Sequence, residues 1–132
     1  TVDNSAFEIT IPAVIRPSDR ATSFKVGAEL VNIRPDEYIE VSISSGCDSR
    51  SMVVMKRQNV PAGKTVSTLE TRFSAGGNPI GSNGYIVGHF EDGSNIVNSI
   101  GDISMSAVNA NDKTEAGDYL ATIEFKVDLK KK

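Results

Sequence analysis

Apolar and polar residues alternate over short stretches along most of the chain. Near the start, Phe7, Ile9 and Ile11 alternate with polar residues until Pro12. Because successive side chains of a strand point to opposite faces, this period of two predicts a half-buried β-strand. The same period recurs at residues 24–30.

Further strands are expected along the rest of the chain. Residues 52–55 are a short continuous apolar run, which is expected of a buried strand. The remaining runs expected to be strands are residues 38–43, 66–73, 85–90 and 100–108. The clearest alternation comes last and predicts a single strand over residues 119–129. Its apolar face carries Tyr119, Ala121, Ile123, Phe125, Val127 and Leu129.

Turn residues separate these runs, and no stretch has a helical period. Glycine, proline and asparagine cluster between the strands, and residues 73–84 and 109–117 are expected to be long polar connections. About seven to nine short strands with one apolar face predict an all-β, antiparallel β-sandwich, Ig-like or jelly-roll-like, without significant helix. A length of 132 residues, 39% of them hydrophobic, suits a single domain over residues 1–132.

Charge and hydropathy exclude some classes of partner. The net charge of -3 argues against binding to nucleic acid, which requires a basic face. No apolar run approaches the roughly 18 residues that a membrane-spanning helix needs, so no membrane insertion is expected.

The residues also offer little for catalysis. The chain has one cysteine, Cys47, and one histidine, His89. An activated nucleophile needs a base beside it, and zinc usually takes three or four Cys, His or carboxylate ligands. Cys47 follows a glycine in a turn and His89 lies within an expected strand, so a bystander thiol and a strand histidine are the simpler interpretations. The chain is therefore predicted not to be an enzyme and to need no cofactor.

One loop offers oxygen ligands for calcium. Asn109, Asn111, Asp112 and Asp118 cluster before the last strand. Carboxylate and amide oxygens suit Ca²⁺, although the spacing lacks the Asp-x-Asp-x-Asp-Gly pattern of a known calcium loop. A weak calcium site and an ordinary polar turn both remain open here.

The two ends of the chain resemble a known group of domains. Residues 7–13, Phe-Glu-Ile-Thr-Ile-Pro-Ala, resemble the opening strand of β-sandwich domains secreted by Firmicutes. Residues 116–127 resemble their closing strand, with Ala121 where that pattern usually has glycine. Such domains occur in WxL-type wall-associated proteins, and similar sandwiches build extracellular, pilin-like fibres. The resemblance implies an extracellular location, secreted or on the cell surface, and it implies no particular ligand.

These observations lead to one principal hypothesis. The chain is expected to be a structural or adhesive subunit of a bacterial surface assembly such as a fibre or pilus, associating with itself or with other surface proteins. Phe7, Ile9 and Ile11 would be inserted into a neighbouring copy by strand complementation, beside residues 119–129. The alternative is an ordinary first strand within its own sheet.

Two alternatives remain. One is a monomeric module that binds glycan or protein through loops 74–84 and 109–118, although a chain without tryptophan lacks the usual aromatic platform for sugars. The other is a β-sandwich domain of a phage virion.

Overall fold

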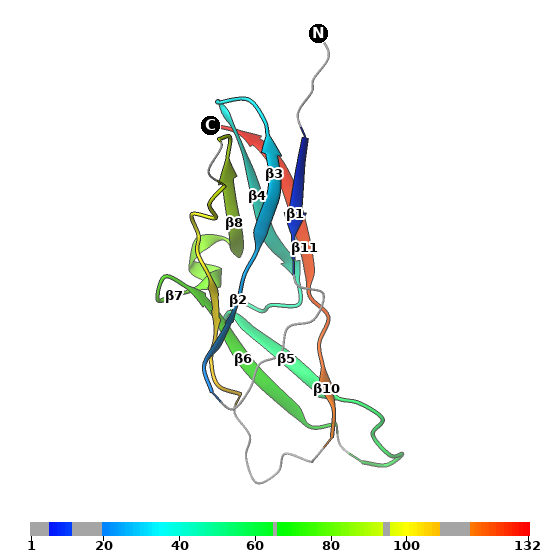
Figure 1. Cartoon of the computed structure of the whole chain (residues 1–132). Helices are drawn as coiled ribbons and strands as arrows, with labels where there is room; N and C mark the ends of the chain where they lie inside the picture. Colours follow the sequence, from blue (N-terminus) through cyan, green and yellow to red (C-terminus); the bar gives the residue numbers. More distant parts are fainter. Residues whose placement is uncertain (1–5, 12–19, 65, 94–95, 109–116) are drawn as a thin grey trace.

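The computed structural model describes residues 6–11, 20–64, 66–93, 96–108 and 117–132, and these residues are built almost wholly of antiparallel β-strands (Figure 1). The first sheet pairs β1 (Ala6–Thr10) with β3 (Gly27–Asn32). The third sheet has the order β11 (Glu124–Lys131), β4 (Glu37–Ser45) and β8 (Ile86–Glu91). The prediction of an all-β, antiparallel, sandwich-like fold is confirmed.

The second sheet is the largest. Its order is β10 (Tyr119–Leu120), β5 (Met52–Arg57), β6 (Thr68–Ala75), β9 (Ile103–Met105) and β2 (Thr22–Phe24), and β7 (Asn78–Pro79) also pairs with β6. One 3-10 turn, η1 (Ile80–Asn83), connects β7 to the segment before β8. In Figure 1 the first and third sheets occupy the upper part of the molecule, and β5, β6 and β10 extend below them.

The sandwich is filled by apolar side chains from all three sheets. On β4, Ile39, Val41 and Ile43 are buried and alternate with side chains that face outward, as the sequence pattern predicts. Phe73 of β6 packs against Phe24 of β2, with ring centroids 5.3 Å apart at an angle of 60°. The other buried apolar residues of this cluster are Val26, Val31, Ile33, Val53, Ile80, Val87, Phe90, Ile103 and Met105.

Two runs that the sequence analysis treats as single strands are each divided between two sheets. Residues 24–30 contain the end of β2, which pairs with β9, and the start of β3, which pairs with β1. Residues 119–129 contain β10, which pairs with β5, and most of β11, which pairs with β4. The single-strand predictions were wrong because the alternation of apolar residues does not record which strand a segment is hydrogen-bonded to.

Smaller corrections concern lengths and loops. The described residues form eleven strands, and β7 and β10 have two residues each, so the predicted seven to nine strands were too few. The expected loop 73–84 contains the end of β6, β7 and η1, because Gly76 and Gly77 adopt positive φ and reverse the chain. Ile80 then anchors η1 with a fully buried side chain. The predicted strand 100–108 is reduced to the three residues of β9, and β5 alternates between buried and half-buried positions.

Candidate functional site

The first strand lies at the edge of its sheet. Phe7 and Ile9 are half-buried in β1, and Ile11, just beyond it, is half-buried too; all three pack against the core cluster. Among the described residues, β3 is the only strand that pairs with β1, and the register shifts between Glu8 and Ile9. Within the described chain β1 does not pair with residues 119–129, because β10 pairs with β5 and β11 with β4. A position of an inserted strand beside residues 119–129 therefore stays a prediction.

The C-terminal candidates lie in two places. Tyr119 is half-buried in β10, where its hydroxyl lies 2.5 Å from the Ser67 hydroxyl. Ile123 and Phe125 are half-buried against the core, whereas Val127 is 38% exposed. Tyr119 therefore belongs to the second sheet, and Phe125 and Val127 belong to β11 in the third.

β11 is an eight-residue edge strand whose core-facing side is only partly covered. Val127 lies opposite Val41 and Leu129 lies opposite Ile39, and both of these β4 side chains are completely buried. Val127 and Leu129 are nevertheless each 38% exposed. In Figure 1, β11 (orange to red) begins at the right-hand side and crosses β1 and β3 in this view to reach the C-terminus at the upper left. Among the described strands β11 pairs with β4 alone, so it combines one edge without a described partner, called the free edge below, with a partly exposed apolar face.

The outward face of β11 carries charges of alternating sign. Glu124, Lys126, Asp128 and Lys130 occupy successive outward positions. Lys130 Nζ lies 2.5 Å from Glu40 Oε2, and this contact raises the pKa of Lys130 above its ordinary value. Lys126 Nζ lies 3.5 Å from Asp128 Oδ2. The two acids and two lysines leave this face of β11 without net charge.

The histidine takes part in the same outward surface. The His89 ring stacks on Tyr38, with centroids 4.7 Å apart and an angle of 24° between the planes. Its Nε2 atom lies 3.8 Å from Glu91 Oε1, which also accepts a 2.9 Å contact from Lys132 Nζ. These contacts, the hydrogen bond from Lys132 foremost, hold the pKa of Glu91 below its ordinary value. The ring is therefore part of the stacked and charged surface of the third sheet.

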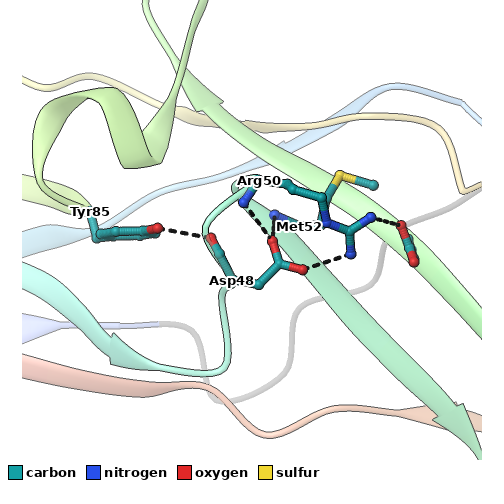
Figure 2. Close-up of polar contacts among 5 residues, drawn as sticks. Asp48, Arg50, Met52 and Tyr85 are labelled. Atoms are coloured by element: carbon teal, nitrogen blue, oxygen red, sulfur yellow. Dashed lines mark hydrogen bonds and ion pairs between the residues drawn. The ribbon is translucent and has the colours of Figure 1, made fainter.

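A polar corner that the sequence analysis missed connects β4 to β5 (Figure 2). Asp48 accepts hydrogen bonds from the backbone amides of Arg50 at 2.9 Å and Met52 at 3.0 Å. The Arg50 guanidinium lies 2.7 Å from Asp48 Oδ2 and 3.4 Å from Glu70 Oε2. The side-chain hydrogen bond from Arg50 is the main reason why the pKa of Asp48 lies below its ordinary value.

The same corner also connects to η1 and the start of β8. The Tyr85 hydroxyl donates to the Asp48 carbonyl oxygen at 2.8 Å, and the Gly81 amide donates to the buried Ser51 hydroxyl at 2.9 Å. Ser51 and Tyr85 both adopt positive φ, at 64° and 61°. Non-glycine residues are uncommon in this region, so the surrounding hydrogen bonds must hold them there. An acid two residues before an arginine was the available sequence signal, and the corner it builds is structural.

The single thiol is held in an unreactive state. Cys47 is half-buried against the core cluster. Burial, and secondarily the charge of Asp48, raises the pKa of the thiol from 9.0 to about 11. A thiol that stays protonated at neutral pH is a poor nucleophile.

The calcium candidates are only partly within the described chain. Asn109, Asn111 and Asp112 lie outside the described residues. Asp118 is exposed, and its backbone carbonyl accepts a hydrogen bond from the Gln58 amide at 2.7 Å. Across the described ranges, no group of three or more His, Cys, Asp or Glu side chains is arranged to hold a metal ion.

Comparison with known proteins gives no relative: the chain matches no protein-family model, no curated protein and no solved structure. Within the part of the chain that the structure describes, no helix has the length and apolar character to span a membrane.

Proposed function

We propose that this protein is a non-catalytic structural subunit of a bacterial extracellular assembly, and that copies join by exchanging the N-terminal strand. The observation that carries the proposal is the position of β1. It lies at a sheet edge and pairs with β3 alone among the described strands. The resemblance of both chain ends to secreted surface domains supports the extracellular location.

The contacts of β1 favour exchange over simple docking. Phe7 and Ile9 contribute half-buried apolar side chains to the core, so a β1 that leaves must be replaced. The β1 of a second copy restores the same side-chain contacts and the same main-chain ladder with β3. Exchange of an identical element between copies therefore costs little at equilibrium. Repeated head to tail, the exchange builds an open filament.

The register of β1 and β3 supplies a covalent test. Thr10 lies opposite Gly27, where an added Cβ meets nothing within 4 Å and the backbone φ is ordinary. We suggest Thr10→Cys with Gly27→Cys in a Cys47→Ala background, oxidised at high protein concentration and separated on a denaturing gel without reductant. Strand exchange gives a ladder of linked chains, because each disulfide then joins two copies.

A variant that lacks residues 1–10 is the control for assembly. It should form no fibres by negative stain, whereas the full chain should form them. Strand exchange is wrong if oxidation of the double-cysteine protein gives only intrachain disulfides and the full chain is monomeric at every protein concentration tested.

A further inference from the structure

We propose that β11 is a second assembly site, which pairs edge to edge and antiparallel with β11 of another copy about a two-fold axis at Val127. The inference rests on the proposed function, since it gives the assembling subunit a contact separate from β1. It would join two three-stranded sheets into one continuous six-stranded sheet. The observations that carry it are the free edge, the half-exposed apolar face and the order of charges along the strand.

The apolar face fits such a pairing. With Val127 opposite its own copy, Phe125 lies opposite Leu129 of the second molecule, and Leu129 opposite Phe125. Directly opposite side chains on one face of an antiparallel pair are in contact. Pairing would therefore cover Val127 and Leu129, which are each 38% exposed although they belong to the core-facing side of β11.

The charged face fits the same register. Glu124 then lies opposite Lys130 of the copy, and Lys126 lies opposite Asp128. Each pair occurs twice because the contact is symmetric, so four oppositely charged pairs form along one strand. All four residues already project to the outward face, where an incoming strand would meet them.

Neighbouring registers are disfavoured by the same charges. Sliding the copy by two residues in one direction sets Lys126 against its own copy and Glu124 against Asp128. Sliding it by two residues in the other direction sets Lys126 against Lys130 and Asp128 against its own copy. A slip by one residue would place apolar positions opposite charged ones. The register centred on Val127 is therefore the antiparallel arrangement that sets all four outward charges of β11 opposite a charge of the other sign.

Lysines on an edge strand commonly prevent sheets from joining. On β11 the lysines alternate with acids, so the outward face of residues 124–130 does not repel a copy that approaches in this register. An edge protected by like charge would lack the acids at positions 124 and 128. The pattern thus fits selective pairing with a second copy of this chain.

Two charge-swapped variants test the register directly. Lys126→Asp alone places two acids opposite each other on both sides of Val127. Asp128→Lys alone places two lysines opposite each other at the same positions. Each variant should have a lower sedimentation coefficient than the unmodified chain, because the β11 contact is lost. When the two are mixed, the acids of one face the lysines of the other, and the pairing should return. Both substitutions lie on the outward face, so circular dichroism should show both variants folded. These measurements use the full chain at a concentration below that of fibre formation.

Cysteine cross-linking gives a matched control. In a Cys47→Ala background, Val127→Cys should link to its own copy with a short thiol-specific cross-linker. Leu129→Cys starts from the same exposed fraction, but the two copies would be separated by four residues, or about 14 Å, along the strands. It should link poorly. Equal linking of the two variants, or no recovery of pairing on mixing the charge variants, would overturn the proposal.

The outcomes separate the two proposals. A cysteine ladder from positions 10 and 27 without any effect of the β11 variants would leave strand exchange standing and reject the β11 contact. If the mixed charge variants pair again but no ladder forms, the β11 contact stands and strand exchange is rejected. If neither the cysteine ladder nor the recovery of pairing is observed, self-assembly is rejected as the function.

Discussion

Asp128 of β11 lies directly opposite Glu40 of β4, so two acids face each other across the strand pair. Like charges in this position are unfavourable, and two lysines offset them. Lys130 contacts Glu40 and Lys126 contacts Asp128. The outward surface of the third sheet is therefore stable as a charge network rather than as isolated pairs.

Replacement of Lys130 tests this network. Lys130→Gln leaves Glu40 and Asp128 opposed with one lysine fewer, so the melting temperature should fall. The raised pKa of Lys130 means that its contribution is complete at neutral pH and is lost as the pH rises through that pKa. The effect of the substitution should shrink in 0.5 M NaCl, because salt screens surface charges. A loss of the same size at low and high salt, measured by thermal melts, would argue against the network.

The acid side of the pH profile should depend on Asp48. Its pKa is lowered from 3.8, so its stabilising contribution is present above that value and is lost as the pH falls through the lowered pKa. Asp48→Asn should reduce the melting temperature at pH 7 and flatten its decline below pH ~4. Asp102→Asn removes an exposed carboxylate elsewhere and serves as the control. Parallel melting curves for Asp48→Asn and the unmodified protein from pH 7 to pH 2 would contradict this assignment.

Cys47 should react slowly with alkylating reagents in the folded protein. A rise in the thiol pKa from 9.0 to about 11 lowers the thiolate fraction at neutral pH. Two pKa units correspond to about a 100-fold smaller thiolate fraction at pH 7, so the reaction with iodoacetamide should be slower than in the unfolded chain. Mass spectrometry after timed exposure, with and without guanidinium, measures the ratio. Rapid modification of the folded protein at pH 7 would show that burial does not control this thiol.

Gly46, at the corner between β4 and β5, should not tolerate replacement by a larger residue. It adopts a φ of 98°, and a Cβ there would collide with the Thr122 carbonyl oxygen and lie 2.9 Å from the Ile123 Cα. Gly46→Ala should lower the free energy of unfolding by about 1–3 kcal/mol, because it combines a strained conformation with a backbone clash.

Gly27→Ala is the matched control for this substitution. Its φ is ordinary and an added Cβ meets nothing within 4 Å, so its effect should stay within about 0.5 kcal/mol. Urea unfolding of the two variants measures both values. Similar values for the two would mean that the chain at Thr122 yields to the added methyl group.

The sequence predicted the fold class because apolar and polar residues alternate along the strands in step with buried and exposed side chains. β4 is the clearest case, with Ile39, Val41 and Ile43 all buried. The pattern could not show that residues 24–30 and 119–129 change sheets. Val26 is buried just after β2 ends, so the alternation continues through the change of hydrogen-bond partner.

The candidate site was predictable only in part. The apolar residues of both terminal strands were identified, and Phe7, Ile9 and Phe125 do pack against the core. The free edge of β11 was not predictable, because strand order depends on pairing between distant segments. The Asp48 corner was missed for the same reason, since Glu70 and Tyr85 reach it from elsewhere in the chain.

The passage of the chain between sheets has a mechanical consequence. β2 continues into β3, β4 into β5, and β10 into β11, and each of these short links joins strands of two different sheets. If one sheet separated from the core, each short link would also displace the strand that it joins in a second sheet. We therefore expect the three sheets to unfold together in one cooperative step rather than one after another.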